Sequence, residues 1–449
     1  MNLFCFKAYD IRGRYPSDLD EPLARGLGFA FAQEFQPERV VIGHDARLSG
    51  PALYEALAEG LRAAGVDVTG IGLCGTEEIY YAAFARDFDG GIMVTGSHNP
   101  ADENGFKLVR RGAVPVSSDS GLFAMRRRIA AGQSIPAELL GSFAEANYRN
   151  GYIEYLLSYI KPESLRRLRI VADPGNGCAG LVLQKLTERL PVELHIIHGE
   201  PDGTFPNGVP NPLLPEKRAL TAQAVREARA DFGIAWDGDF DRCFFYDAEG
   251  RFIEGYYLVG MIAEALLRRH PGAKIIHDPR LVWNTRDVVA KAGGTALESR
   301  TGHAFIKERM RAEDALYGGE MSAHHYFHDF AYCDSGMIPW LLVAQLLSDS
   351  GRTLADCVED RMAAFPCSGE INSHVEDIRA VLARLEAKYA ALPDAEVTHT
   401  DGVSVAFPNW RFNLRSSNTE PILRLNVESR GDKALMEAKT EELLNEIRG

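Results

Sequence analysis

The stretch "RVVIGHDARLSGPALYEALAEGLRAAG", residues 39–65, contains the local pattern that decides the fold. An apolar, β-branched run ends in a polar turn that begins at Asp45, and a helical pattern of apolar residues follows. This order predicts a strand, a loop and a crossover helix, the building unit of an α/β domain. The same order returns in "LRIVADPGNGCAGLVLQKLTERL" (168–190) and "AKIIHDPRLVWNTRDVVAKAGG" (273–294), which predicts three similar α/β domains.

The chain length agrees with several domains, because 449 residues exceed the roughly 100 to 200 that one domain usually takes. The predicted domains are 1–147, 148–250, 251–365 and 366–449. The last of them contains the helical stretch "HVEDIRAVLARLEAKYAAL" and then three short alternating segments typical of strands. A smaller α+β domain is therefore expected at the C-terminal end.

Loops at the carboxyl ends of strands bind ligands in α/β proteins. Asp45, Asp173 and Asp278 each begin such a loop in the three similar stretches. These positions are candidates for a site, although capping of the following helix explains each aspartate equally well.

The composition excludes several classes of function. There are 63 acidic and 49 basic residues, a formal net charge of -14, which disfavours nucleic acid as a partner. Seven scattered cysteines without a CxxC pair argue against a disulfide framework and a zinc site, and favour a reducing cytoplasm. The first residues lack the apolar core of a signal peptide, and the longest apolar stretch, "GMIPWLLVAQLL", is too short to span a membrane. We expect a soluble, cytoplasmic protein without an obligate protein partner.

"GIAWDGDFDRC", residues 233–243, predicts a metal site. In an extended chain, the alternation of Asp237, Asp239 and Asp241 would aim three carboxylates to one side. Such carboxylates repel each other unless a hard cation such as Mg²⁺ lies between them. An EF-hand is excluded, because Arg242 and Ala248 stand where that loop needs glycine and an acid.

"TGSHNP", residues 95–100, places Ser97 in a polar turn after an apolar strand. The nucleophile elbow of hydrolases requires glycine at the position of Asn99, so an acyl-transfer triad with His98 is disfavoured. A serine beside a metal loop can instead carry a phosphoryl group, with Lys107 as a neutralising cation.

Three further stretches contain candidate ligands. "GGEMSAHHYF" (318–327) places Glu320 and Ser322 where they can hold a pair of sugar hydroxyls. "TGHAFIKERM" sets His303 and Lys307 one helical turn apart, although a helix cap with a solvated lysine explains this pattern equally well. "RFNLRSSNTEP" (411–421) concentrates hydrogen-bond donors in a turn and predicts an anion cradle, with an ordinary hairpin as the alternative.

Four motifs occur in the order typical of one enzyme superfamily. "TGSHNP", "DGDFDR", "GEMSAH" and "RSSNTEP" match its phosphoserine, metal, sugar and phosphate loops. Along essentially its whole length, the chain resembles the α-D-phosphohexomutase superfamily, and within it the bacterial phosphomannomutase/phosphoglucomutase group. The resemblance implies three α/β domains with mixed sheets and a smaller C-terminal α+β domain, similar to the TATA-binding protein, around a central cleft.

The resemblance also implies an activity. It is the interconversion of mannose 6-phosphate and mannose 1-phosphate, and also of the two glucose phosphates. Ser97 would carry the phosphoryl group, and Mg²⁺ would be held by Asp237, Asp239, Asp241 and a phosphoryl oxygen on Ser97. The group passes to the sugar phosphate, the resulting hexose 1,6-bisphosphate turns end for end, and its other phosphate returns to Ser97. Hexose phosphates would be the partners, and hexose 1,6-bisphosphate would be the activator. The mannose 1-phosphate would be used in the synthesis of GDP-mannose and polysaccharide.

Other residues take their roles only from the resemblance. Arg12 and Arg242 would steady the transferring group, His98 would be a further catalytic residue, and either Lys107 or His303 would be the general acid or base. The implied substrate-binding residues are Tyr9, Arg280, Glu320, Ser322, His324, Arg415, Ser417, Asn418 and Thr419. The chain departs from the family pattern in Ala323, where many relatives have glycine, and in Arg280, where some have lysine.

Three alternatives remain beside this interpretation. A phosphoglucosamine mutase shares the fold and mechanism, but Met321 favours the mannose/glucose group because the amino-sugar enzymes usually have glutamine there. A metal-dependent phosphatase would pass the phosphate from Ser97 to water, and would not need to bind both ends of its substrate. A noncatalytic sugar-phosphate sensor would not need the serine and the three aspartates.

Overall fold

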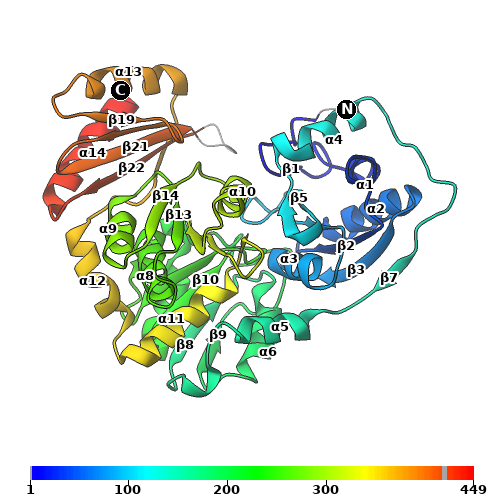
Figure 1. The fold of residues 1–449 in the computed structure, drawn as a ribbon, viewed down its shortest axis with the longest axis horizontal. Coiled ribbons are helices and arrows are strands. Elements are labelled where there is room, and N and C mark those ends of the chain that lie inside the picture. Colours follow the sequence, from blue (N-terminus) through cyan, green and yellow to red (C-terminus); the bar gives the residue numbers. More distant parts are fainter. Residues whose placement is uncertain (1–2, 417–421) are drawn as a thin grey trace. The chain divides into compact units, whose positions relative to one another are not determined.

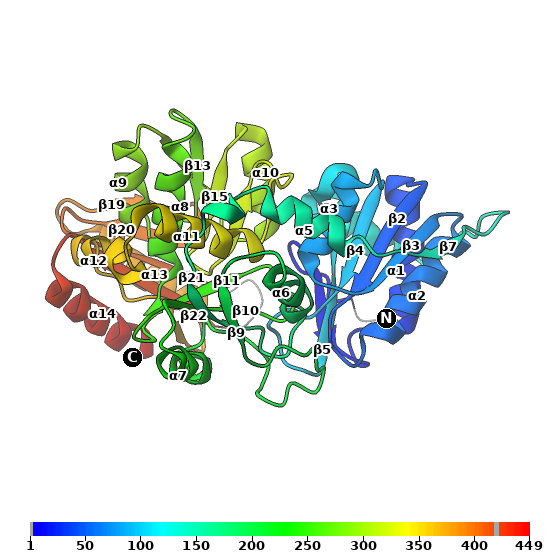
Figure 2. The same ribbon diagram turned by 90° about the horizontal axis from the view of Figure 1, so that it is seen from below.

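The structure of the chain is a computed structural model that describes residues 3–416 and 422–449 (Figures 1 and 2). It packs as two compact units that are discontinuous in sequence. The first unit comprises residues 1–252 and 324–351, and the second comprises residues 253–323 and 352–449.

The first sheet of the first unit is mixed. In the order β1-β5-β4-β2-β3-β7, strand β2 is parallel to β3 and β4, whereas β5 is antiparallel to β4 and β1. The strands are β1 (Ile11–Arg14), β2 (Arg39–His44), β3 (Asp67–Leu73), β4 (Gly90–Val94), β5 (Glu103–Arg110), β6 (Val114–Pro115) and β7 (Phe143–Glu145). The helices are α1 (Glu21–Phe35), α2 (Gly50–Ala63), α3 (Thr76–Ala85) and α4 (Phe123–Ala130).

Close packing of α1 against α2 covers this sheet with one continuous apolar core. Glycine permits the approach, because a Cβ atom at Gly28 would lie 2.6 Å from the backbone nitrogen of Leu61. A Cβ atom at Gly60 would lie 2.1 Å from the carbonyl oxygen of Arg25. Side chains at either glycine would therefore push the two helices apart.

The second sheet of the first unit is also mixed, in the order β12-β11-β10-β8-β9. Strand β10 is parallel to β8 and antiparallel to β11. The strands are β8 (Arg169–Asp173), β9 (Glu193–Ile196), β10 (Phe232–Trp236), β11 (Cys243–Asp247) and β12 (Phe252–Ile253). The helices are α5 (Arg149–Leu157), α6 (Ala179–Thr187) and α7 (Ala219–Ala228).

The first unit is completed by a later segment that holds β16 (His325–Phe327), β17 (Cys333–Asp334) and α11 (Met337–Ser350). The carboxylate of Glu77 on α3 is buried and accepts hydrogen bonds from the backbone N–H groups of Gly336 and Met337, at 3.1 and 3.2 Å. Trp236 on β10 donates from Nε1 to the carbonyl of Gly336 at 2.9 Å. These bonds fix the start of α11 beside the end of β10.

The N-terminal part of the second unit contains three parallel strands, β13 (Lys274–His277), β14 (Thr295–Glu298) and β15 (Tyr317–Gly319). Its helices in this part are α8 (Gly255–Leu267), α9 (Trp283–Lys291), α10 (His303–Glu313) and α12 (Leu354–Ala364). The C-terminal part is an antiparallel sheet in the order β18-β22-β21-β20-β19. The strands of this sheet are β18 (Ile371–Ser373), β19 (Glu396–Thr398), β20 (Val403–Ala406), β21 (Trp410–Ser416) and β22 (Leu423–Ser429). The helices of the C-terminal part are α13 (Ile378–Ala390) and α14 (Lys433–Arg448).

Both C-terminal helices pack against this antiparallel sheet (Figure 1). Leu385 of α13 and Leu443 of α14 meet Val405, Phe412 and Leu425 of the sheet in one core. The alternation of apolar residues along β21 and β22 places one set on this buried face. This part is therefore a small α+β domain, as predicted.

Each of the three similar stretches forms the predicted strand, loop and helix, as β2 with α2, β8 with α6, and β13 with α9. The prediction of α/β domains with mixed sheets and an α+β domain at the C-terminal end is confirmed. The ranges given above for the four domains stay predictions. No helix among residues 3–416 and 422–449 combines the length and the apolar character needed to cross a membrane.

Candidate active site

Three buried aspartates, Asp237, Asp239 and Asp241, lie in the loop between β10 and β11. One carboxylate oxygen of each lies within 4.8 Å of those of the other two. The loop is not extended, because residues 238–239 form a turn and Phe240 has a left-handed φ of 51°. This turn, rather than the alternation of an extended strand, brings the carboxylates together.

The chemistry of this cluster fits a divalent cation. Burial and the neighbouring carboxylates of Asp241 and Asp239 raise the pKa of Asp237 to about 7. Oδ1 of Asp239 is buried and accepts no hydrogen bond from the described parts of the chain. Mutually repelling carboxylates are stabilised by a hard cation, and Mg²⁺ prefers oxygen ligands. The three aspartates can therefore hold Mg²⁺.

Ser97 lies just after β4 and is buried, with a left-handed φ of 49°. Its Oγ donates to Oδ2 of Asp237 at 2.8 Å and lies 3.2 Å from Nδ1 of His98. Its backbone N–H donates to Oγ1 of Thr95 at 2.8 Å, and Thr95 donates to Asp45 at 2.7 Å. The loop thus holds the hydroxyl of Ser97 against the carboxylate cluster.

The buried guanidinium of Arg47 organises the loop that carries Ser97. It donates to the main-chain carbonyl oxygens of Ser97 (2.8 Å), Asn99 (2.6 Å), Pro100 (2.5 Å) and Glu103 (2.6 Å). A Cβ atom at Gly96 would lie 2.5 Å from this guanidinium, so only glycine fits there. One side chain therefore satisfies four carbonyl groups of the loop.

Substitution Arg47→Met is expected to lower the free energy of unfolding by about 3 to 5 kcal/mol, because four carbonyl groups lose their donor and Asp45 loses its ion pair with the guanidinium. Urea denaturation measures the change. Arg25→Met is the control, since Arg25 and Glu59 form a salt bridge with both side chains more than half exposed, at 55% and 53%. The control is expected to cost less than about 1 kcal/mol. Equal losses in the two variants would contradict the organising role of Arg47.

Cationic side chains surround the three aspartates. Lys107 on β5 donates from Nζ to Oδ2 of Asp239 at 2.7 Å and also to Asp241. Nε of Arg242 lies 3.6 Å from Oδ2 of Asp237. Both cations are largely buried, so their attraction to the carboxylates is weakly screened. The arrangement can stabilise further negative charge near Ser97.

Arg12 on β1 also reaches the loop of Ser97. It donates from NH1 to Oδ1 of Asn99 at 2.6 Å and from Nε to Asp10 at 2.6 Å. Tyr9 lies half-buried in the bend just before this strand. The structure thus places Arg12 against the loop that carries Ser97, and the roles of Arg12 and Tyr9 stay predictions.

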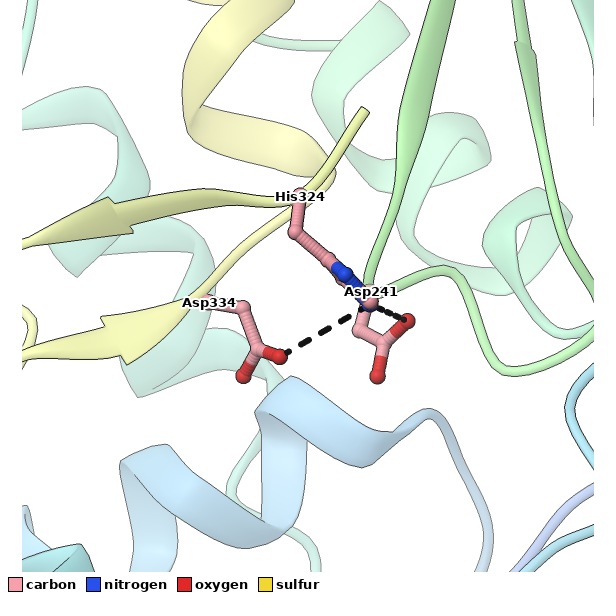
Figure 3. A group of neighbouring side chains, drawn as sticks. All are labelled: Asp241, His324 and Asp334. Atoms are coloured by element: carbon pink, nitrogen blue, oxygen red, sulfur yellow. Dashed lines mark ion pairs between the residues drawn. The ribbon is translucent and has the colours of Figure 1, made fainter. Parts of the chain in front are cut away.

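His324 lies between two buried carboxylates (Figure 3). Its Nε2 is 3.3 Å from Oδ1 of Asp241 and 4.0 Å from Oδ2 of Asp334. Nε of Arg242 is 3.2 Å from the same nitrogen. Asp241, His324 and Asp334 form a second group whose ligand atoms could hold a cation. This group shares Asp241 with the group beside Ser97.

The second unit carries the predicted sugar loop. The buried guanidinium of Arg280 donates to Asp278 at 2.6 Å, to Oγ of Ser322 at 3.1 Å and to Oε1 of Glu320 at 3.4 Å. Oε1 of Glu320 also accepts the backbone N–H of Gly302 at 3.2 Å. Arg280 thus holds together the carboxylate and the hydroxyl that were predicted to bind sugar.

His303 is the first residue of α10, and Lys307 lies one turn further along. Nζ of Lys307 lies 3.4 Å from Nδ1 of His303. Lys307 is fully buried, so the alternative of a solvated lysine is wrong. His303 is also buried, with 6% of its surface exposed.

Arg415 stands near the end of β21 and donates from NH2 to Oε2 of Glu370 at 3.0 Å. Glu370 also contacts NH1 of Arg280 at 3.2 Å and NH1 of Arg424 at 3.3 Å. Burial alone would raise the pKa of Glu370, but Arg415, Arg424 and Arg280 lower it to about 2. The other predicted members of the phosphate loop, Ser417, Asn418 and Thr419, lie outside the described residues.

Sequence reasoning missed Arg47, Asp334 and Glu370. A signal existed for Arg47, because the order His-Asp-x-Arg occurs twice, at residues 44–47 and 277–280. In both turns the backbone N–H of the arginine returns to Oδ1 of the aspartate at 3.0 Å. No spacing pattern pointed to Glu370, since its three arginines are far away in sequence.

Four models of known protein families match most of the chain. Models described as phosphoglucomutase/phosphomannomutase, alpha/beta/alpha domains I, II and III, match residues 4–133, 150–250 and 254–365. The model of the C-terminal domain of the same family matches residues 370–445. The four matches follow one another in the order of the family.

Individual proteins agree with this result. The chain is 58% identical to "Phosphohexose mutases" of Xanthomonas campestris pv. campestris, over all of both chains. It is 59% identical to a phosphomannomutase of Salmonella montevideo, over 99% of this chain and 98% of the relative. A solved phosphoglucomutase/phosphomannomutase family protein from Burkholderia thailandensis is 34% identical, with a TM-score of 0.87 over 98% of this chain and 96% of its own. The chain therefore belongs to the phosphoglucomutase/phosphomannomutase family.

Proposed function

We propose that the protein is a phosphohexomutase that interconverts mannose 6-phosphate and mannose 1-phosphate, and also glucose 6-phosphate and glucose 1-phosphate. The observation that carries the proposal is the hydroxyl of Ser97, held 2.8 Å from Asp237 within a cluster of three buried carboxylates and two cations. A hydroxyl in this setting suits the transfer of a phosphoryl group. The names and lengths of the matched relatives support the same activity.

Asp237, Asp239 and Asp241 would hold Mg²⁺, which when bound supplies positive charge against the phosphoryl oxygens. Lys107, Arg12 and Arg242 stabilise the remaining negative charge of the transferring group. The neutral state of His98 is favoured, because burial and the cations Arg242 and Arg12 hold its pKa well below the usual range. Its imidazole lies against Oγ of Ser97.

The proposed reaction consists of two phosphoryl transfers through Ser97. In the first, a sugar hydroxyl oxygen bonds to the phosphorus on Ser97 while the bond from phosphorus to Oγ breaks. The hydroxyl proton passes to a base. Of the two candidates, His303 fits this role, because Asp239 and Asp241 outweigh the effect of burial, raise the pKa of Lys107 and keep it cationic. The hexose 1,6-bisphosphate then turns, and its other phosphate returns to Oγ. The same hydroxyl is thus acceptor and donor in one cycle.

The roles of the second unit follow from its polar groups. Glu320 and Ser322, held by Arg280, would bind a pair of sugar hydroxyls. Arg415, with Ser417, Asn418 and Thr419, would hold the phosphate that is not reacting. In the first unit, His324 and Tyr9 are the remaining proposed substrate contacts. Expulsion of water around such groups strengthens each electrostatic contact.

The test is kcat/KM for mannose 1-phosphate and glucose 1-phosphate on one preparation with Mg²⁺ and a trace of hexose 1,6-bisphosphate. We expect both sugars to be isomerised, with values within about 10-fold of each other, because the sugars differ only in one epimeric hydroxyl. Glucosamine 1-phosphate is the comparison substrate. Faster turnover of the amino sugar would favour a phosphoglucosamine mutase. Release of inorganic phosphate without isomerisation would show a phosphatase instead.

A further inference from the structure

Glu370 lies directly before β18 and has a side chain that is only 4% exposed. Its carboxylate meets three guanidinium groups, those of Arg415 at 3.0 Å, Arg280 at 3.2 Å and Arg424 at 3.3 Å. A single carboxylate thus links Arg415, at the predicted phosphate loop, Arg280, which holds the sugar loop, and strand β22.

Among the residues that the structure describes, the charges of this buried group are balanced. Its three arginines are matched by Glu370 and by two carboxylates on Arg280, those of Asp278 and Glu320. The low pKa of Glu370 means that its carboxylate is ionised at neutral pH. The nearby guanidinium of Arg411 is balanced separately, by Glu428 at 2.8 Å. The group therefore presents little net positive charge to a ligand.

Carboxylate and phosphate oxygens use the same N–H groups of arginine. Arg415 was assigned above to the phosphate that is not reacting, yet its NH2 already donates to Glu370. An incoming phosphate meets a guanidinium whose charge is partly neutralised and one of whose nitrogens already donates to a carboxylate. The affinity for phosphate is then lower than three arginines alone would produce.

We propose that Glu370 is a positioning residue and counter-charge that limits the affinity of the phosphate grip, so that a bound phosphate is released between the two transfers. The inference rests on the proposed function, because only an enzyme that exchanges the two ends of its substrate must release the grip in each cycle. Tight binding would slow this exchange without helping the chemical step.

The test compares Glu370→Gln with the wild-type chain by calorimetric titration of glucose 1-phosphate and by steady-state kinetics. Glutamine keeps the shape of the side chain and removes its charge. The expected result is a Kd lower by about 10-fold, together with a lower kcat and a lower KM. Unchanged or weaker binding of glucose 1-phosphate by the variant would overturn the proposal.

Glu428→Gln is the matched control, since Glu428 is also buried in the second unit and also pairs with an arginine. Its Kd is expected to stay within about two-fold of the wild type, and a Kd as low as that of Glu370→Gln would overturn the specific role of Glu370. If the glutamine variant does not fold, Glu370→Asp withdraws the carboxylate by one methylene and keeps its charge. Its affinity is expected to rise by less than about 10-fold, and a fall would count against the proposal.

Arg415→Met separates this inference from the proposed function. We expect weaker binding of glucose 1-phosphate, by about 10-fold or more. If Arg415→Met weakens binding but Glu370→Gln does not tighten it, only the role of Glu370 is wrong. If Arg415→Met has no effect, the phosphate role of Arg415 fails, and with it the role of Glu370, while the isomerisation assay decides the function independently.

Discussion

Replacement of Ser97 by alanine is expected to lower the turnover of mannose 1-phosphate by at least about 10⁴-fold, because the phosphoryl group loses its carrier. The protein is expected to keep its fold. Alanine tolerates the left-handed φ of 49° no worse than serine, and the variant loses two contacts of the hydroxyl, those with Asp237 and His98. A coupled assay for mannose 6-phosphate measures the change, with the melting temperature as the check on folding.

Ser49→Ala is a suitable control for this experiment. Ser49 lies in the same unit, and its hydroxyl accepts a hydrogen bond from Asn104 at 2.8 Å. Its loss is expected to change turnover by less than about three-fold, the usual range for one neutral hydrogen bond away from the reaction. Substantial turnover in the Ser97 variant would show that this hydroxyl does not carry the group.

Asp239→Asn is expected to abolish the stabilisation of the protein by Mg²⁺ and to lower turnover by at least about 10³-fold. The variant removes one of three anionic ligands, and a ligand that binds only the folded state raises the melting temperature by an amount that grows with the logarithm of its concentration divided by its Kd. Thermal melting with and without Mg²⁺, and with EDTA, measures binding independently of activity. The wild-type melting temperature is expected to rise with Mg²⁺ and to fall back with EDTA.

Asp334→Asn shows which of the two acidic groups holds the cation. Asp334 belongs to the group with His324 and Asp241, whereas Asp239 belongs to the group beside Ser97. We expect the Asp334 variant to keep the Mg²⁺-dependent rise in melting temperature. If instead Asp334→Asn removes the rise and Asp239→Asn keeps it, the cation binds beside His324 and the assignment to the aspartate loop is wrong.

Local patterns carried enough information for the fold. An apolar run, a turn and an amphipathic helix are specified by neighbouring residues, so β2 with α2 and its two equivalents could be predicted from the sequence. The division into two discontinuous units could not be predicted from the sequence. It depends on long-range packing, such as the bonds from Glu77 to the start of α11 far along the chain.

The site was predictable where its residues are close in sequence. Asp237, Asp239 and Asp241 were identified together, but the reason given for their convergence was wrong, because a turn with a left-handed Phe240 brings them together. Glu370 could not be identified, since its effect depends on arginines supplied by other strands and loops. A group of residues that meet only through tertiary contacts shows no characteristic spacing in the sequence.

The proposed mechanism depends above all on Ser97 as the carrier of the phosphoryl group, and mass spectrometry tests this directly. The purified full chain is incubated with glucose 1,6-bisphosphate and Mg²⁺, and intact mass and peptide mapping then locate any added phosphoryl group. We expect one phosphoryl group per chain, on Ser97, and its transfer to the sugar when mannose 1-phosphate is added. Modification at another residue, or loss of the group to water without transfer to sugar, would contradict the proposed mechanism.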